Sequence, residues 1–290
     1  MGELRMSKLI DTYGREHRNL RVSLTDRCSL RCTYCMPNDF AAWIPNDDLL
    51  TTNELLTVIE VAVEQGINEV RLTGGEPLLR PDIVEIVDRI AGLANAPRLT
   101  LTTNGLKLKE LALPLAKAGL NRINISLDTL SRERFKKLTY RDRFDDVIEG
   151  LHAAKAAGLF PIKVNTVLLQ GINDDEAPAL LAWAIENEYS LRFIEQMPLD
   201  AGGIWDRATM VTADQIYADL STHYELTPVD GRGSAPAEEF YINGTQATVG
   251  IIGSVTRPFC GACDRLRLTS DGQLRSCLFS NEEVDVRKVL

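Results

Sequence analysis

The sequence has few histidines, few aromatic residues and no long apolar run. Only His17, His152 and His223 occur, and none is placed to complete a Cys3His metal site. Aromatic residues make up 6% of the 290 residues. No stretch of about eighteen uninterrupted apolar residues and no signal-peptide core is found. We therefore expect a cytoplasmic protein without a membrane partner.

The chain also lacks an excess of basic residues. Its formal net charge of −9 argues against nucleic acid as a partner, because phosphate backbones demand a broad basic face. A cluster of basic side chains inside a pocket remains compatible with this net charge. Apolar and charged contents of 44% and 25% are those of an ordinary globular protein, which at this length forms one large α/β domain or two smaller ones.

All six cysteines fall into two groups of three, and in a reducing compartment they are metal ligands or catalytic thiols rather than disulfides. The groups are Cys28, Cys32 and Cys35, spaced CxxxCxxC, and Cys260, Cys263 and Cys277. Three thiols leave a tetrahedral zinc or iron ion one ligand short, and a small molecule can bind there. A structural zinc site is the alternative for the first group. A zinc ribbon or a redox pair is the alternative for the second.

A strand and helix alternation runs through most of the chain. Thr51-x-x-Glu54 is a capping box before one helix, Pro81 stands at a first helical position, and another helix covers 175–188. Six consecutive βα units indicate a parallel sheet or barrel. The strands are expected near 20–25, 68–73, 99–103, 121–127, 161–168 and 191–195.

The sequence patterns at the two ends of the chain differ from this alternation of strands and helices. Residues 1–18 are polar and without period, which we interpret as an N-terminal arm. After about residue 230, Gly-rich turns and short strands follow, near 238–242, 246–252 and 265–269. We therefore divide the chain into the arm, a barrel over 19–230 and a smaller module over 231–290.

Each expected barrel strand has one polar face, whereas parallel strands between helices normally read as continuous apolar runs. If the apolar set packs on the helices, the polar set faces a shared interior. Side chains such as Arg71 and Lys163 cannot stay unpaired in a dry core, so the interior is a lumen that holds a ligand. The predicted lumen residues include Arg21, Arg71, Thr102, Asn124, Ser126, Lys163 and Asn165.

The first cysteine loop, with Tyr34 as its aromatic residue, resembles the CxxxCxφC loop of the radical S-adenosylmethionine (SAM) superfamily. Gly74-Gly75-Glu76 follows the second strand; alone it is a common turn, but in this place it resembles the superfamily's GGE motif. The resemblance implies a [4Fe-4S] cluster that binds and cleaves SAM. It also implies that the backbone and acidic group of the GGE motif hold the methionine end of SAM.

Over nearly its whole length the chain resembles the GTP 3′,8-cyclase family of molybdenum cofactor biosynthesis. The matching segments are Leu20 to Cys28, Arg192 to Glu195 with Met197, Phe259-Cys260 and Cys277-Leu278-Phe279. The resemblance implies a partial (β/α)6 barrel with a C-terminal α+β extension that carries a second [4Fe-4S] cluster. Family members continue to a Gly-Gly tail, so we expect this sequence to be truncated before it.

The same resemblance implies a lyase that converts GTP to (8S)-3′,8-cyclo-7,8-dihydroguanosine 5′-triphosphate, using two [4Fe-4S] clusters and SAM. Its partners are an electron donor and a downstream cyclic pyranopterin monophosphate synthase, and a homodimer is compatible with it. The implied SAM contacts are Tyr34, Gly75, Ser126 and Met197. The implied GTP contacts are Arg21, Arg71, Thr102, Lys163, Arg265 and Arg267. The implied catalytic residues are Arg192, Arg265 and Arg267.

Two other functions share some of these features. A different radical SAM enzyme with an auxiliary cluster, such as a peptide maturase, has both cysteine groups but should lack the triphosphate contacts of Arg265 and Arg267. A zinc-stabilised binding module has the cysteines without the chemistry. Any single lumen arginine is better explained as a solvated charge, but the converging set is what a triphosphate needs.

Overall fold

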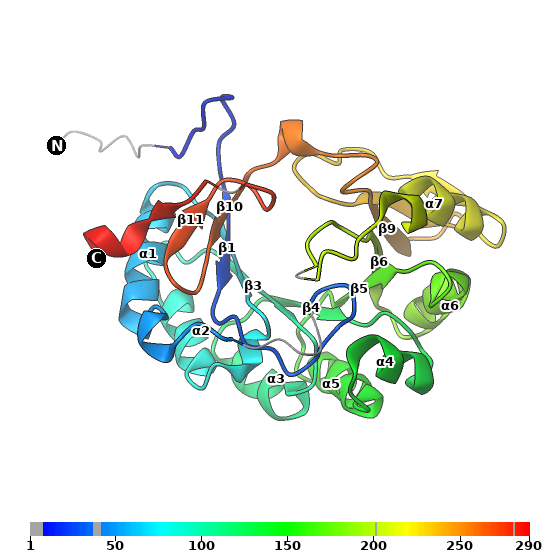
Figure 1. Ribbon diagram of the computed structural model, residues 1–290, viewed down its shortest axis with the longest axis horizontal. Helices are drawn as coiled ribbons and strands as arrows, with labels where there is room; N and C mark the ends of the chain where they lie inside the picture. The colour runs from blue at the N-terminus through cyan, green and yellow to red at the C-terminus, as the bar shows by residue number, and fades with distance from the viewer. Residues whose placement is uncertain (1–7, 37–41, 201, 281) are drawn as a thin grey trace.

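The computed structural model describes residues 8–36, 42–200, 202–280 and 282–290. At its centre six parallel strands follow one another in chain order, each paired with the next (Figure 1). They are β1 (Asn19–Ser23), β2 (Glu69–Thr73), β3 (Arg98–Thr103), β4 (Arg122–Ser126), β5 (Lys163–Leu168) and β6 (Ser190–Glu195). The six expected strands are therefore confirmed, and their ends lie within two residues of the predicted ones.

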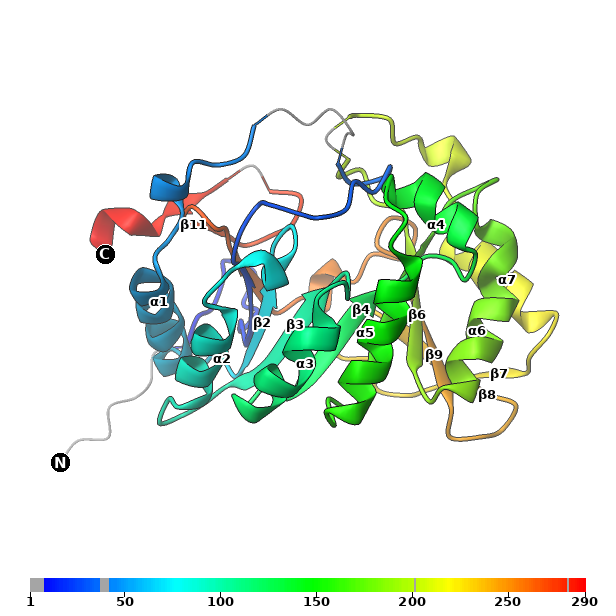
Figure 2. The same cartoon turned by 90° about the horizontal axis from the view of Figure 1, so that it is seen from below.

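Seven helices cover the outer face of this curved sheet among the described residues, and Figure 2 shows them side by side. They are α1 (Thr52–Glu64), α2 (Ile83–Ala91), α3 (Leu108–Lys117), α4 (Arg132–Thr139), α5 (Phe144–Ala156), α6 (Ala177–Glu186) and α7 (Ala213–Ser221). In the described ranges no helix combines the length and apolarity that crossing a bilayer requires.

The helix starts follow the sequence signals with one difference. Thr51 and Glu54 form the expected capping box, in which each side chain accepts a hydrogen bond from the other residue's backbone N–H. Pro81, predicted at a first helical position, instead precedes α2 by two residues, and Asp82 is the residue at the helix boundary. The fixed φ of proline still directs the chain into the helix.

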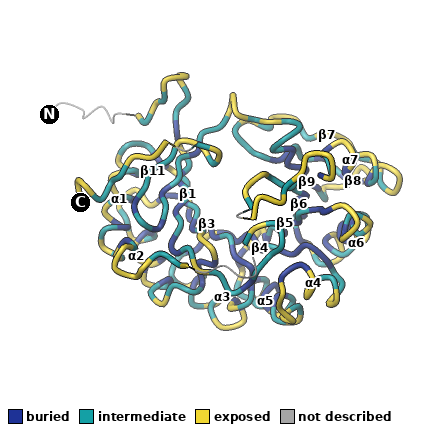
Figure 3. The backbone as a smooth tube through the Cα atoms, viewed as in Figure 1, coloured by how far each residue is buried: buried dark blue, intermediate teal, exposed yellow. Residues whose placement is uncertain are grey.

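The two faces of each strand differ as the alternation predicted. In β2, Val70 and Leu72 are 0% exposed against the helices, while Arg71 and Thr73 on the other face are partly exposed. Figure 3 shows buried backbone along the strands and exposed loops around them. The apolar core therefore lies between sheet and helices, and the polar faces turn inward.

Residues after 225 extend the same sheet at both edges. Their strands are β7 (Leu226–Pro228), β8 (Glu238–Ile242), β9 (Thr248–Ile252), β10 (Arg265–Leu268), β11 (Gln273–Arg275) and β12 (Val284–Asp285). β9 pairs in parallel with β6, and β10 pairs in parallel with β1. The segment between β9 and β10 crosses from one edge to the other (Figure 1). The barrel is thus open, with C-terminal strands on either side of the opening.

Residues 8–18, expected as a lead-in without structure, form a hairpin that contacts the C-terminal residues. Ile10 and Glu16 form a β-bridge, and Arg15 Nη1 donates a hydrogen bond to the Cys260 carbonyl at 2.6 Å. The sequence shows no period here because the hairpin is held by polar contacts rather than by an apolar face.

Candidate active site

The first cysteine group lies on the loop after β1, at the carboxyl ends of the barrel strands. The loop is held by backbone hydrogen bonds from Arg31 to Thr139 (3.0 Å) and from Thr33 to Leu138 (2.9 Å), at the end of α4. Cys28 and Cys32 are partly buried, and Cys35 is exposed. Asn104, after β3, brings its Nδ2 to 3.9 Å from Cys28 Sγ and 3.1 Å from Ser29 Oγ.

The three thiols share one electrostatic environment. Burial raises the pKa of each, most strongly that of Cys32, and the charges of Asp128 and the neighbouring thiolates raise the pKa of Cys32 further. Thiols that hold their protons this firmly need a cation before they ionise together. The three thiols therefore fit a metal centre whose positive charge neutralises three thiolates. Binding of the metal would release the thiol protons.

The first cysteine group offers three thiols as metal ligands. Within the described ranges, no three His, Cys, Asp or Glu side chains converge closely enough to hold one metal ion. Zinc requires its sulfur ligands at about 2.3 Å from one point. Thiolates around a [4Fe-4S] cluster bind different irons and stand farther apart. The three thiols of the first group match the protein ligands of a [4Fe-4S] cluster with one iron left open, whereas a zinc ion there would lack its fourth ligand.

Tyr34 is anchored next to these thiols by a buried carboxylate. Its hydroxyl donates a hydrogen bond to Asp128 Oδ2 at 2.7 Å, and Asp128 Oδ1 accepts one from Val167 N at 2.9 Å. Burial raises the pKa of Asp128 to about 6, although both hydrogen bonds oppose this. Asp128 thus ties the cysteine loop to the ends of β4 and β5.

The GGE segment packs directly on the backbone that leads into the cysteine loop. Gly75 N donates to Thr25 O and Glu76 N to Arg27 O, each at 2.7 Å. A Cβ added at Gly75 would lie 2.3 Å from Asp26 O and 2.5 Å from Arg27 O. Only glycine permits this approach.

The acidic group of the GGE motif is buried and hydrogen-bonded within the protein. The Glu76 carboxylate, 1% exposed, accepts hydrogen bonds from Thr103 Oγ1 and Asn104 N, both at 2.7 Å, and from Leu78 N at 3.0 Å. Its oxygens are thus engaged by protein donors. The carboxylate thereby joins the loop after β2 to the end of β3, and its contact with the methionine end of SAM stays a prediction.

Replacing Gly75 by alanine is expected to lower the free energy of unfolding by ~3 kcal/mol, because the new methyl group meets two rigid carbonyl oxygens. SAM binding should be lost with it. Gly92→Ala is the matched control, since a Cβ there makes only ordinary contacts of 3.4 Å or more at the end of α2. Thermal unfolding of both variants gives the comparison, and equal melting temperatures would contradict the close approach.

The polar faces of the strands line a cavity of about 210 Å³. Its cationic wall residues are Arg21, Arg71, Arg192, Arg265 and Arg267, and its neutral polar strand residues include Thr73, Thr102, Asn124 and Asn165. Met197 also lines it, as do the apolar side chains of Ile194, Ile252, Phe259, Leu278 and Phe279. A polar cavity is therefore present where the lumen was predicted. Arg21, Arg71, Thr102, Asn124 and Asn165 line it, whereas Ser126 and Lys163, predicted with them, do not.

Positive charge in the cavity is only partly compensated. Burial lowers the pKa of Arg21 well below its usual value, and Arg71 and Arg267 lower it further. Burial and the Arg265 charge lower the pKa of Arg267 to about 10. Burial and the charges of Arg192 and Arg122 lower the pKa of Lys163 to about 7. Cationic side chains that lower one another's pKa in this way favour the binding of an anionic ligand.

The second cysteine group lines the same cavity, opposite the polar strands. Cys260, Cys263 and Cys277 all contribute to its wall. Arg265 lies between them and the strands, with Nη1 at 3.9 Å from Cys263 Sγ and its guanidinium 4.9 Å from the Phe259 ring centre. The two distant halves of the sequence thus meet at one site.

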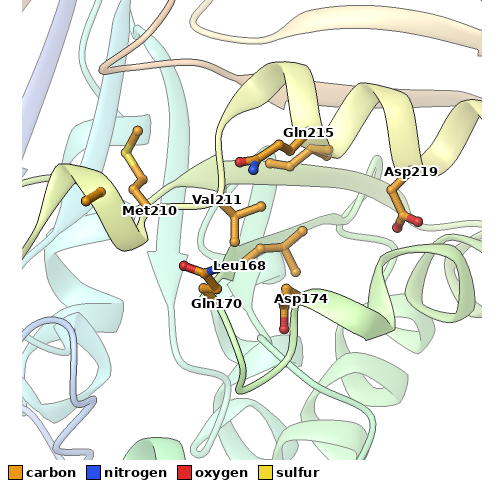
Figure 4. Close-up of a pocket in the computed structure, with 9 residues that line it drawn as sticks. Leu168, Gln170, Asp174, Met210, Val211, Gln215 and Asp219 are labelled. Carbon is orange, nitrogen blue, oxygen red and sulfur yellow. The ribbon is translucent and has the colours of Figure 1, made fainter.

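Another pocket, of about 180 Å³, lies between the end of β5 and α7 (Figure 4). Leu168, Met210 and Val211 provide its apolar part, and Asp174 and Asp219 carry carboxylates on either side. No lysine, arginine or cysteine lines it. It has none of the features that point to an anion or a metal cluster, so the candidate site is the cationic cavity.

Comparison with known proteins identifies the family. The radical SAM superfamily model matches residues 22–184, and the Molybdenum Cofactor Synthesis C model matches residues 189–290. A GTP 3′,8-cyclase of Streptomyces coelicolor is 59% identical over 285 residues, which cover 97% of this chain and 84% of the relative. One of Mycolicibacterium smegmatis is 53% identical over 288 residues, covering 97% and 80%. The chain belongs to the GTP 3′,8-cyclase family of radical SAM enzymes.

Solved structures share the radical SAM fold at low sequence identity. SuiB of Streptococcus suis bound to S-adenosylmethionine has a TM-score of 0.69 and 17% identity, over 95% of this chain and 65% of that one. Native anSMEcpe with bound AdoMet has a TM-score of 0.58 and 14% identity, over 91% and 75%. Membership of the superfamily implies a [4Fe-4S] cluster and SAM, and the first cysteine group supplies three thiols for such a cluster.

The residues that the radical SAM resemblance singled out lie in different settings. Met197 faces the cavity, whereas Ser126 ends β4 beside Asn165 and is not among the cavity-lining residues. The hydroxyl of Tyr34 is engaged by Asp128, and Gly75 acts through its backbone. Lys163 lies beyond the cavity wall, next to Arg192.

Sequence reasoning missed the residues that orient this radical SAM site. They are Arg15, Asn104, Asp128 and Glu239. A signal exists for two of them, since Asn104 and Asp128 follow the polar faces of β3 and β4 directly at their carboxyl ends. Arg15 and Glu239 lie outside the six βα units, and no periodicity marks them.

Proposed function

We propose that the chain is a GTP 3′,8-cyclase, which converts GTP to (8S)-3′,8-cyclo-7,8-dihydroguanosine 5′-triphosphate in molybdenum cofactor biosynthesis. The observation that supports this most directly is a single cavity walled by arginines, with a three-cysteine group at its side and another on the loop after β1. Relatives at 59% and 53% identity carry the same name.

In this proposal Cys28, Cys32 and Cys35 hold the cluster that binds SAM. When bound, reduced cluster and SAM together supply the radical chemistry, and the protein supplies orientation and exclusion of water. The loop is suited to this because Asp128 fixes Tyr34 beside the thiols and the GGE backbone closes on the residues before Cys28. The expected SAM contacts are Tyr34 through its ring or backbone, Gly75, Ser126 and Met197.

Cys260, Cys263 and Cys277 hold a second [4Fe-4S] cluster, whose open position takes the guanine of GTP. Arg21, Arg71 and Lys163 take the phosphates, with Thr102 beside them. Arg21 and Arg71 come from the neighbouring strands β1 and β2, Lys163 comes from β5, and protein groups only partly compensate their charge. Arg192, Arg265 and Arg267 orient the nucleotide between the two cysteine groups. Phe259 and Leu278 give the cavity apolar walls that exclude water.

The proposal includes partners that lie outside this chain. An electron donor must reduce the first cluster, and a cyclic pyranopterin monophosphate synthase consumes the product. GTP is the small-molecule substrate.

One assay tests the proposed reaction. Anaerobically purified and reconstituted protein, reduced by dithionite, is mixed with SAM and GTP, and the products are separated by chromatography. We expect 5′-deoxyadenosine and the cyclised nucleotide in equal amounts. Formation of 5′-deoxyadenosine without any change to GTP would exclude the cyclase and favour another radical SAM enzyme, such as a peptide maturase. Two zinc ions without acid-labile sulfide would favour a zinc-stabilised module instead.

GTP binding is expected to take up a proton above neutral pH. The pKa of Lys163 is lowered to about 7 in the free protein, and a phosphate beside the ammonium group would raise it. GTP affinity should therefore fall as pH rises from about 7 toward the higher pKa of the complex. Calorimetry at pH 8 in two buffers of different ionisation enthalpy measures this uptake. Lys163→Met should abolish it, and identical heats in both buffers for the unaltered protein would contradict the role of Lys163.

A further inference from the structure

Glu239, in β8, reaches two cations of the barrel from the C-terminal part of the chain. Its Oε1 accepts a hydrogen bond from Arg192 Nη2 at 2.7 Å and lies 4.0 Å from Lys163 Nζ. Because β6 pairs with β9 and β9 with β8, Arg192, Gly250 and Glu239 stand in one row across three strands. The ion pair thus spans the sheet between positions that are far apart in sequence.

Gly250, in the middle of this row, leaves room for the contact. A Cβ added there would lie 3.0 Å from Arg192 Cγ and 3.1 Å from Ala237 Cβ, tighter than ordinary packing. With only a hydrogen at this position, the Arg192 side chain crosses the backbone of β9 and meets the carboxylate. The row therefore holds Arg192 in one extended orientation, with 8% of the residue exposed.

Carboxylates are scarce around the cations at this end of the barrel. In the described part of the chain, Glu69 pairs with Arg71 at 2.9 Å and lies 3.8 Å from Arg122, and Glu239 is shared by Arg192 and Lys163. Each carboxylate thus compensates two cations. Arg71, Arg122 and Arg192 also act on Lys163 by repulsion. A carboxylate in such a field adds stability to the empty protein but reduces the charge available to an anionic ligand.

We propose that Glu239 is an internal competitor of the substrate's phosphates, and that its carboxylate occupies Arg192 and Lys163 until a polyphosphate replaces it. The proposal rests on the GTP-binding function proposed above and adds a residue that sets phosphate affinity. Glu239 is a positioning residue, since it acts through Arg192 and Lys163. It makes phosphate binding an exchange of one anion for another, so the site holds polyphosphates less tightly than its cations alone would.

The test uses Glu239→Gln in the full chain, reconstituted anaerobically and left unreduced so that no turnover occurs. Calorimetry measures the Kd of inorganic triphosphate, GTP and guanosine. We expect inorganic triphosphate and GTP to bind about tenfold tighter, because the competing charge is gone. Guanosine, which carries no phosphate, should bind as before. A distortion of β8 would change guanosine binding as well.

Glu238→Gln is the matched control. Glu238 neighbours Glu239 in β8 but pairs with Arg232 at 2.7 Å and Arg257 at 2.8 Å, away from Arg192. Its loss should leave all three affinities unchanged. If Glu239→Gln does not fold, Glu239→Asp withdraws the carboxylate from Arg192 while keeping the charge, and a smaller tightening for inorganic triphosphate is expected.

Several results would overturn the proposal. Affinity for inorganic triphosphate that is unchanged or weaker in the Glu239 variant would show that the carboxylate does not compete. An equal gain for guanosine would assign the effect to altered structure. Should the unaltered protein bind inorganic triphosphate but not GTP, the proposed cyclase function would fail, and the role of Glu239 would still be judged from inorganic triphosphate alone.

Discussion

The Cys32→Ala variant is expected to lose all measurable SAM cleavage and about half of its iron. Cys32 lies in the middle of the first group, and burial, with the charges of Asp128 and the other two thiolates, raises its pKa well above the usual value. Two remaining thiolates cannot hold a stable cluster, so iron should fall from about eight to about four atoms per chain. GTP binding should persist, because the cavity wall is formed by other residues.

Iron and acid-labile sulfide analysis, 5′-deoxyadenosine formation and GTP calorimetry on one anaerobic preparation give the three readouts. The chain has no cysteine outside the two groups, so the second group supplies the internal control. Retention of 5′-deoxyadenosine formation in Cys32→Ala would show that this group does not carry the reaction.

The Cys260→Ala variant is expected to show the reverse pattern. It should also lose about four irons, yet keep SAM binding, because the loop after β1 is held by α4 and the GGE segment rather than by Cys260. GTP affinity should fall by at least about tenfold, since the open position for guanine disappears while the cationic wall remains. Cyclisation should be lost.

Three measurements separate this pattern from general unfolding. Thermal stability and SAM affinity should stay close to those of the unaltered protein, and GTP affinity should not. Affinity for inorganic triphosphate should also be retained, because the arginines of β1 and β2 do not depend on the cluster. Intact GTP binding and cyclisation in Cys260→Ala would refute the substrate-binding role of the second group.

Much of the cavity could be predicted because strand alternation has a fixed period. Once Val70 and Leu72 are placed against helices, Arg71 must face the other way, and parallel register then brings it beside Arg21. The sites of both cysteine groups were likewise expected from local spacing. These are properties of a few consecutive residues, which sequence displays directly.

The partners of these side chains could not be predicted in the same way. Glu239 and Glu238 are adjacent and chemically identical, and only the register of β8 against β9 decides which of them reaches Arg192. Glu76 was assigned to a ligand because its motif is local, but two of its three hydrogen-bond donors, Thr103 Oγ1 and Asn104 N, lie at the end of β3 and just after it. Long-range pairing depends on packing that no short pattern encodes.

The pairing of β1 with β10 also constrains how the molecule is made. Asn19 stands opposite Arg265, so one edge of the first strand stays unpaired during synthesis until β10 has been made. Contacts of such sequence separation form late and slowly, and exposed strand edges invite aggregation meanwhile. Because β10 also positions Arg265 and Arg267 at the cavity, the substrate site is completed only after β10 has paired with β1, well after the loop that carries the first cysteine group has been synthesised.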